Sequence, residues 1–586
     1  MPGASYPTAR AEQSRNKEIS RRINALPELF DHLPLSWSLW HAVCTCDVRQ
    51  ADELVGQHAG VMNAMANKNI FQSVVGKLLP VTDAVNEAGG RAYALAPKHQ
   101  LAQYAATGCF NRTFYATAEG QLAKALELCG KVDAEFIART AVFCRERGQM
   151  KDIPALLVAM LSVKDRALFQ AVFPRVIDNG RMLRNFVQIV RSGVVGRKSL
   201  GTAPKRMIRE WFAARDDEAI FRASVGNDPS LADIIRMTHP RPVSETRQAL
   251  FGWLIGREIN VDALPEAVRR FEQFKTGATS ELPDVPFQML TSLELGAPEW
   301  TQIARRAPWQ MTRMNLNTFA RHGVFDQPGL PELIAQRLRD EREVRKARVF
   351  PYQLLAAYTM TDDRVPQVVR EALQDAMEIA IGNVPESSGK VYVFPDISGS
   401  MHSPVTGHRK GATSKVRCID VAALVAAAVL RRNPQAEVIP FESDVVKVKL
   451  NPRDSVMTNA AKLASLPCGG TNCSAPLREL NRRRASGDLL IYVSDNESWI
   501  DSPIHGHWGG SRTETIKQWA QFKSRNPQAR MVCLDLQPYG TTQAQEREDI
   551  LNIGGFSDQV FEVIAEFAAG RLNADHWVGV IEAVTI

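Results

Sequence analysis

Apolar and polar positions follow two different patterns along the chain. From about Leu35 to Ile381, apolar residues recur every three or four positions, and short turns carrying Gly, Pro or Asp separate these stretches. This spacing places apolar side chains on one face of a helix, so it predicts helix after helix with no convincing strand between them. The clearest helices are expected at residues 121–128, 134–147, 155–161, 167–172 and 333–348.

Two of these helices carry recognisable start signals. Asp133 precedes an apolar periodic stretch and is expected to cap it, while Pro154 lies near the start of the following helix. Helical pairs of this length favour a HEAT-like repeat array (an α-solenoid) over a single bundle.

The second pattern begins after a polar linker at residues 382–389. From there, short apolar runs alternate with helical periodicity, which predicts a doubly wound α/β sheet. Strands are expected at 391–394, 437–441, 489–494 and 530–536, and helices at 416–431, 455–466, 477–484, 515–522 and 559–567. The predicted organisation is therefore an N-terminal extension (residues 1–34), a helical domain (35–385) and an α/β domain (386–586).

Oxygen-bearing side chains follow the ends of two of the predicted strands. Asp396, Ser398 and Ser400 come directly after one strand, and Asp495 ends another. Thr471 lies in a Gly-Gly-Thr loop before a helix. Carboxylates and hydroxyls spaced in this way suit a divalent cation, most plausibly Mg²⁺, that keeps an open position for a partner's oxygen. Three such loops form the pattern of the metal-ion-dependent adhesion site (MIDAS) of a von Willebrand factor A domain.

Composition sets the class of protein. A chain of 586 residues is too long for a single hydrophobic core, so two or more domains are expected. No apolar run is long enough to span a membrane, and the polar, basic N-terminus shows no signal peptide. The odd count of nine cysteines fits neither a disulfide framework nor a zinc site, so reduced thiols and a cytoplasmic location are expected. His505 and His507 are interpreted as a Gly-rich surface loop rather than a metal site.

The net charge of +7 permits an anionic partner without requiring one. Basic residues concentrate between positions 191 and 215, where Arg197, Lys198, Lys205, Arg206 and Arg209 flank Gly196, Gly201 and Pro204. Such a basic loop beside a helix start favours phosphate contact over a merely solvated helix face. Further on, Arg241 follows His239, which the flanking prolines are expected to push out of helical geometry.

Four aromatic residues and an arginine lie between positions 104 and 115. Tyr104, Phe110, Phe114 and Tyr115 could stack on unpaired bases beside Arg112, although core packing is the more common use of such side chains.

These motifs resemble the TROVE-domain family, the Ro (SS-A) ribonucleoprotein autoantigen and its bacterial relatives, over nearly the whole chain. The motifs are Asp396-Ile397-Ser398-Gly399-Ser400, Gly469-Gly470-Thr471-Asn472-Cys473-Ser474, Ser494-Asp495-Asn496-Glu497, Leu551-Asn552-Ile553-Gly554-Gly555, Thr238-His239-Pro240-Arg241-Pro242 and Leu316-Asn317-Thr318-Phe319. One position departs from the pattern, because the family commonly has Asp where this chain has Asn472.

The resemblance implies a ring of HEAT-like helices closed by the A domain. It also implies small noncoding Y RNA on the outer face, with His239 facing RNA, and single-stranded ends of misfolded RNAs in the central hole. Bacterial relatives look like adaptors that bring structured RNA to an exoribonuclease. The resemblance thus implies a role in RNA quality control or processing by a monomer in the cytoplasm, with no membrane partner.

Three classes of function were compared. No P-loop, zinc-protease helix or G-x-S-x-G elbow is present, so a non-enzymatic RNA-binding scaffold is favoured. The alternative is an adhesion-type A domain that captures a partner's carboxylate through Mg²⁺ without RNA. A nuclease working through Asp396 and Asp495 is less suited, because two-metal sites need more carboxylates.

Overall fold

The computed structural model describes residues 81–107, 111–347, 349, 351–384, 386–387, 389–408, 415–500, 512–537, 539–555, 558–571 and 576–586. These residues lie within a compact unit that spans Leu79–Ile586. The predicted extension at residues 1–34, Phe110, His505 and His507 lie outside the described residues.

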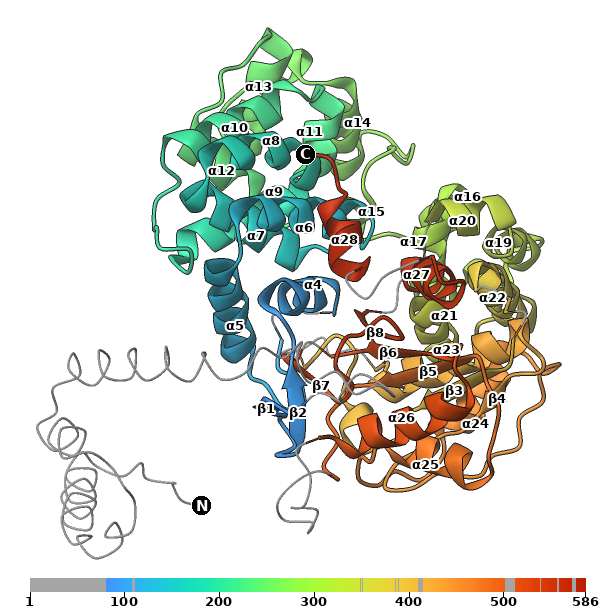
Figure 1. Cartoon of the computed structure of the whole chain (residues 1–586). Coiled ribbons are helices and arrows are strands. Elements are labelled where there is room, and N and C mark those ends of the chain that lie inside the picture. The colour runs from blue at the N-terminus through green and yellow to red at the C-terminus, as the bar shows by residue number, and fades with distance from the viewer. Residues whose placement is uncertain are drawn as a thin grey trace, which may run out of the picture. The chain divides into compact units, whose positions relative to one another are not determined.

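Helices dominate the described chain up to residue 383 (Figure 1). They are α4 (Pro97–Thr107), α5 (Ala118–Lys131), α6 (Ala134–Glu146), α7 (Asp152–Lys164), α8 (Arg166–Val176), α9 (Gly180–Ser192), α10 (Thr202–Ala213), α11 (Asp217–Ala223), α12 (Leu231–Thr238), α13 (Glu245–Leu254), η1 (Val261–Ala263), α14 (Glu266–Lys275), α15 (Phe287–Leu290), α16 (Ala297–Arg306), α17 (Trp309–Met314), α18 (Leu316–Arg321), η2 (Val324–Asp326), α19 (Leu330–Leu338), α20 (Glu341–Ala347), α21 (Pro351–Thr359), α22 (Gln367–Ala380) and η3 (Ile381–Asn383).

Side-chain caps explain where many of these helices begin. Asp133 accepts a hydrogen bond from the Phe136 backbone N–H at 2.6 Å, which confirms its predicted role. Ser230 and Asp233 form a reciprocal capping box at the start of α12. Successive helices pack on one another, α6 on α7 and α8, and α7 on α9, as expected of a helical repeat.

Two sequence predictions for this region are wrong. The helix expected at 333–348 is two helices, because the Asp340 carboxylate accepts the Glu343 N–H and caps a new helix after α19. The region also contains strands, since β1 (Ala84–Val85) and β2 (Arg91–Ala94) form an antiparallel pair. β2 then pairs with β7 (Thr541–Thr542), which comes from the far end of the chain.

The remaining elements build the predicted α/β domain around a parallel sheet of order β4-β3-β5-β6-β8. Its strands are β3 (Val391–Pro395), β4 (Glu437–Val438), β5 (Leu489–Ser494), β6 (Arg530–Asp535) and β8 (Ile550–Gly554). Its helices are η4 (Ser400–His402), α23 (Cys418–Arg432), α24 (Val456–Ala464), α25 (Ala475–Arg482), α26 (Glu514–Arg525), α27 (Asp558–Ala568) and α28 (His576–Glu582).

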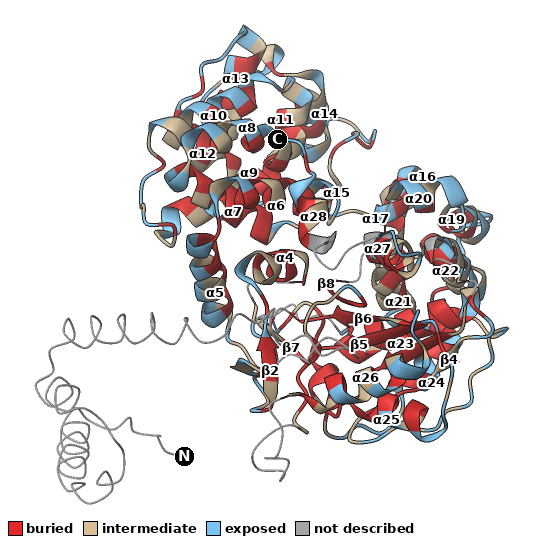
Figure 2. Cartoon of the chain, in the orientation of Figure 1, coloured by how far each residue is buried: buried red, intermediate tan, exposed pale blue. Residues whose placement is uncertain are grey.

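The sheet is covered on both faces, because every residue of β3, β5 and β8 is buried (Figure 2). Val391 and Val393 pack with α23 and the helical region in one hydrophobic cluster. Tyr392 and Phe394 pack in a second cluster with Trp519 of α26. Because side chains alternate across a strand, a run of apolar residues serves two faces at once. This arrangement confirms the doubly wound α/β fold.

The strand order also determines where a ligand would sit. Chain connection reverses direction at β3, which lies between β4 and β5. The carboxyl ends of β3 and β5 therefore flank a topological switch point, which is the usual ligand position in such sheets. Asp396 and Asp495 follow those two strand ends.

Candidate metal centre and nucleic-acid interface

Asp396 is held rigidly at the end of β3. Its side chain is completely buried, and its two oxygens accept hydrogen bonds from the Ser398 N–H (2.8 Å) and the Ser494 hydroxyl (2.5 Å). Ser398 is also buried, and its hydroxyl lies 3.3 Å from the Ser400 hydroxyl. Ser400 in turn lies close enough to the Asp495 carboxylate to interact with it. The structure thus brings four of the five predicted cation ligands, together with Ser494, into one group.

The Gly-Gly-Thr loop reaches the same place through its backbone. The Gly469 carbonyl accepts the Gly399 N–H at 3.0 Å, which joins this loop to the Asp-x-Ser-x-Ser loop. A Cβ on Gly470 would lie 2.4 Å from the Trp499 ring nitrogen, so only glycine permits this approach. Thr471 is buried, and its carbonyl accepts the Trp499 N–H. All three predicted loops therefore converge.

Asn472 has a structural role that an aspartate would not fill. Its side-chain oxygen accepts the Ser474 N–H and hydroxyl, and its amide nitrogen donates to the Ser443 carbonyl at 3.1 Å. Both ends of the amide are used, and the donor end faces a carbonyl that a carboxylate would repel. The hydrogen bond to the Ser443 carbonyl thus accounts for Asn472 at a position where the family commonly has Asp.

Buried carboxyls dominate the electrostatics of this site. Burial and then the Asp495 charge raise the pKa of Asp396 to about 7. Burial raises the pKa of Asp495, and burial followed by repulsion from Asp495 raises the pKa of Glu497 and of Asp535 well above ordinary values. Among the side chains that the structure describes, none supplies a positive charge that lowers the pKa of these four acidic groups at the carboxyl ends of β3, β5 and β6.

A hard divalent cation fits this donor set. Among the described residues, no three His, Cys, Asp or Glu side chains are grouped to hold a metal, so a cation here would depend on hydroxyls. Asp396, Ser398, Ser400, Thr471 and Asp495 supply such oxygens, and a cation would relieve the repulsion between the buried carboxylates.

Sequence reasoning missed two acidic members of this group. Asp535 is the last residue of β6 and Asp495 directly follows β5, so the same strand-end signal could have found Asp535. Glu497 accepts the Glu87 backbone N–H at 2.7 Å and thereby holds the β1–β2 hairpin. That contact joins residues 410 positions apart, and no local pattern predicts it.

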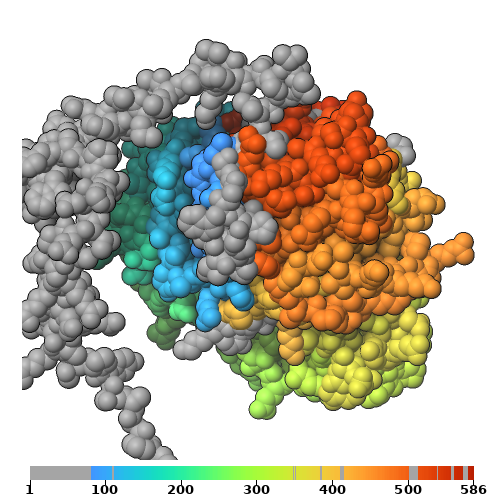
Figure 3. Space-filling view, turned by 60° about the horizontal axis from the view of Figure 1, so that its bottom comes forward, coloured from blue at the N-terminus to red at the C-terminus, as the bar shows by residue number. Residues whose placement is uncertain are grey.

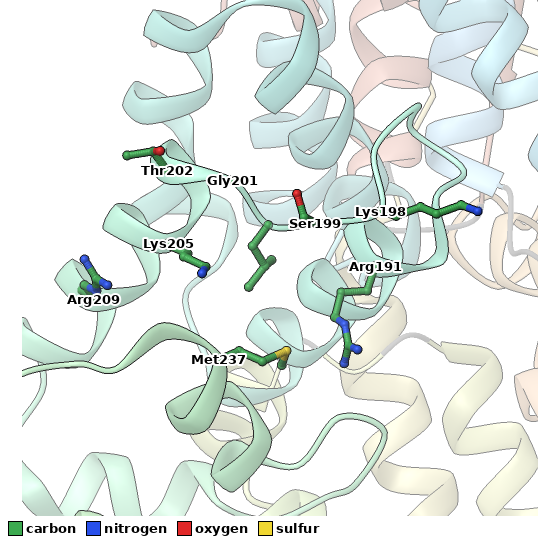
Figure 4. Close-up of a pocket in the computed structure, with 9 residues that line it drawn as sticks. Arg191, Lys198, Ser199, Gly201, Thr202, Lys205, Arg209 and Met237 are labelled. Carbon is green, nitrogen blue, oxygen red and sulfur yellow. The ribbon is translucent and has the colours of Figure 1, made fainter.

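The basic segment between α9 and α10 lines a cavity of about 620 Å³. Arg191, Lys198, Lys205 and Arg209 contribute the charge, and the uncapped start of α10 at Gly201 and Thr202 lies on its wall. In Figure 4, Lys205 and Arg209 project from α10, while Lys198 extends in another direction. Arg191 was not among the predicted contacts, although it opens the same basic stretch.

Some of the predicted basic residues have protein partners. Arg209 donates to the Thr238 carbonyl at 2.6 Å, and Arg197 donates to the Leu200 carbonyl at 3.3 Å. Arg206 pairs with Glu210 at 3.4 Å and does not line the cavity. Lys198 and Lys205 therefore combine exposure to the cavity with freedom from ion pairs among the described residues.

His239 lies at the C-terminal end of α12 in left-handed conformation, with φ of 49°. The predicted departure from helical geometry is confirmed, and the side chain is exposed. It lines a second cavity, of about 890 Å³, with Arg236 and Arg257 at the rim and apolar residues such as Phe251 within. Met237 lines the first cavity, so the end of α12 separates the two. Arg241 is exposed on the adjoining turn.

The aromatic residues between positions 104 and 115 are only partly placed to stack on bases. Tyr104 is buried in the core, so it does not offer a face to a base. Phe114 is 54% exposed, and Tyr115 lies against Tyr539 with ring centroids 5.6 Å apart.

Comparison with known proteins finds two family profiles that match the C-terminal half of the chain. The family profile of the TROVE domain matches residues 297–435, and that of the Ro60 vWA domain matches residues 390–568. A Deinococcus radiodurans protein named RNA-binding protein RO60 is 24% identical over 86% of this chain and 100% of its own length. A Caenorhabditis elegans protein of the same name is 22% identical over 45% of this chain and 40% of its own.

A solved structure supports the fold. The crystal structure of the Deinococcus radiodurans RO (RSR) protein matches with a TM-score of 0.56 and 21% identity, covering 81% of this chain and all of that one. The resemblance to the TROVE-domain family is confirmed, because one chain carries both of its domain types. Among the described residues, no helix is long and apolar enough to cross a membrane.

Proposed function

We propose that this protein is a non-enzymatic RNA-binding scaffold of the Ro type. The observation that carries the proposal is the basic cavity between α9, α10 and α12, where four cationic side chains surround an uncapped helix start. Backbone N–H groups at a helix start and mobile basic side chains together suit phosphates. Relatives bearing the name RNA-binding protein support the same function.

The proposal extends to the kind of RNA. Small noncoding Y-like RNA would bind along α9–α12, and the single-stranded ends of misfolded RNAs would be captured for quality control or processing. An exoribonuclease would then be the partner to which a monomeric cytoplasmic scaffold delivers its RNA. These assignments follow the family resemblance.

The A domain would hold one Mg²⁺ through Asp396, Ser398, Ser400, Thr471 and Asp495. A bound cation would supply positive charge to the buried carboxylates. The protein's own part is to fix the hydroxyls and carboxylates in position, which the hydrogen bonds of Ser494 and the Ser398 N–H already do.

The decisive test of RNA binding is its dependence on salt. Affinity for a structured small RNA, measured by filter binding between 50 and 300 mM KCl, should fall linearly in a log–log plot because phosphate contacts release counterions. Changing Arg191, Lys198 and Lys205 together to Ala should make the slope shallower by roughly two, at about 0.7–0.9 per contact.

The matched control removes three positive charges from the A domain, at Lys462, Arg482 and Lys517 on α24, α25 and α26. This control should keep the wild-type slope. Equal slopes for both triple variants would show that the cavity does not receive phosphates, and the RNA proposal would lose its structural support.

The turn after α12 gives a second test. His239→Ala and Arg241→Ala should each weaken binding several-fold without changing thermal stability, because both side chains are exposed. A parallel loss of melting temperature would mean that the turn is structural rather than RNA-facing.

One alternative is favoured by a specific observation. The buried carboxylates at the ends of β3 and β5 could serve an adhesion-type A domain that captures a partner's carboxylate through Mg²⁺ without RNA. Salt-insensitive RNA binding together with Mg²⁺-dependent capture of an acidic peptide would favour this alternative.

A further inference from the structure

A segment from the helical half lies over the proposed cation site. Residues 111–116 connect to the A-domain loop at 404–408, where the His408 N–H donates to the Arg112 carbonyl at 2.7 Å and Asn111 donates to the Thr406 carbonyl at 2.9 Å. Gly407, with φ of 70°, permits this approach, since a Cβ there would lie 2.8 Å from the Asn111 Cβ. The segment is thus docked by backbone as well as side-chain contacts.

The opposite side of the segment is also fixed to the A domain. The Tyr115 ring packs edge-on against the Tyr539 ring, with the two ring centroids 5.6 Å apart. The neighbouring β1–β2 hairpin is held by Glu497 and by a 2.8 Å hydrogen bond from Asn86 to the Ser498 carbonyl. In Figure 3, the blue and cyan surface of residues 81–131 adjoins the orange and red surface of the A domain.

The Tyr115 hydroxyl ends at the proposed ligands. It lies beside the side chain of Ser400, and the charges of Asp495, Glu497 and Asp396 act on it.

We propose that residues 111–116 close the cation site from within the chain, and that the Tyr115 hydroxyl occupies the position that a partner's carboxylate takes in an open adhesion site. The site is then an internal one. Its cation fastens the segment before α5 to the A domain, and external carboxylates are excluded while the segment is docked.

This inference rests on the Mg²⁺ site proposed above, and one variant separates the two. Asp396→Ala should abolish Mg²⁺ binding by isothermal titration, because it removes a charged ligand. Retention of wild-type Mg²⁺ affinity by Asp396→Ala would overturn the site and the inference with it. RNA binding depends on α9–α12 and is tested independently.

Hydrogen exchange measured by mass spectrometry tests the closure itself. Mg²⁺ should slow exchange in peptides that cover 111–116 of the wild-type protein. Tyr115→Phe keeps the ring against Tyr539 but lacks the hydroxyl, so it should lose this Mg²⁺-dependent protection and bind Mg²⁺ roughly tenfold more weakly, as expected when a supporting hydrogen bond is removed. The matched control is Phe114→Leu, which changes the adjacent exposed ring and should behave as wild type.

Acetate serves as the external carboxylate probe. At constant ionic strength, replacing chloride by acetate should change the Mg²⁺ affinity of the wild-type protein by less than twofold. Tyr115→Ala and Gly407→Ala, which open or displace the segment by different means, should gain several-fold. An equal gain in the wild-type protein, or no effect of Mg²⁺ on exchange in 111–116, would overturn the proposal.

Discussion

The side chain of Asp396 shows how one residue combines fold and chemistry. It ends a strand at the switch point of the sheet, its oxygens are fixed by Ser398 and Ser494, and it is fully buried. A buried carboxylate that is held in place by hydrogen bonds but lacks a cationic partner is costly to ionise. Binding of a cation would therefore stabilise the folded protein through this residue.

That stabilisation can be measured by thermal unfolding in Mg²⁺. At a Mg²⁺ concentration of about 100 times the dissociation constant, the folded state should gain about 2.7 kcal/mol. Asp396→Ala should show no such gain. Asp444→Ala, which removes an exposed carboxylate from a neighbouring loop, should retain it. A Mg²⁺-induced rise in melting temperature that persists in Asp396→Ala would contradict the ligand assignment.

The raised pKa of Asp396 predicts an unusual dependence on pH without divalent cations. Between about pH 4 and 7 the folded protein keeps a proton on this group that the unfolded chain releases. The free energy of unfolding should therefore fall as pH rises through this window. Asp396→Asn cannot ionise, so the difference in stability between wild type and this variant should shrink at low pH. A difference that is constant from pH 4 to 8 would show that the Asp396 pKa is ordinary.

At the scale of elements, one buried arginine joins two helices of the basic region. Arg247 of α13 is almost fully buried, pairs with Asp217, and donates to the Phe212 carbonyl at 3.0 Å and the Arg215 carbonyl at 2.6 Å. It thereby satisfies carbonyls at the C-terminal end of α10, which carries Lys205 and Arg209.

Arg247→Ala should therefore lower the free energy of unfolding by about 3–5 kcal/mol, since it leaves Asp217 and two carbonyls without their donor. Arg241→Ala, six positions away and exposed, should cost less than about 0.5 kcal/mol. Urea unfolding measures both. Similar losses for the two variants would mean that the Arg247 network contributes no more than a surface charge does.

Prediction from sequence succeeded where the signal was local. Asp133 predicted a helix start, and the apolar runs before Asp396 and Asp495 predicted that these two carboxylates follow strands, because capping and strand periodicity depend on neighbouring residues. The β1–β2–β7 sheet was missed because its strands are two to four residues long and β7 lies about 450 positions from β1. Contacts of Tyr115 and Glu497 were missed for the same reason.

At the scale of the whole described unit, the last helix packs on helices near the start of the part of the chain that the structure describes. Arg139 of α6 donates to the carbonyls of Glu582 and Val584, Arg175 of α8 donates to the Thr585 carbonyl, and Lys98 of α4 pairs with Glu582 at 2.6 Å. Ile581 is fully buried beside them. Three helices of the helical half thus hold the C-terminal segment of the α/β domain, and they link the stability of both halves.

Removing one of these donors should weaken that link. Arg139→Ala leaves two main-chain carbonyls without a donor, so it should lower the free energy of unfolding by about 1–3 kcal/mol. It should also raise hydrogen exchange in α28 and α4 together, because α28 packs on α4 as well as on α6. Arg166→Ala, an exposed arginine at the start of α8, is the matched control and should change neither quantity. If exchange rises in α28 alone while α4 stays protected, α28 does not couple the stability of the two halves.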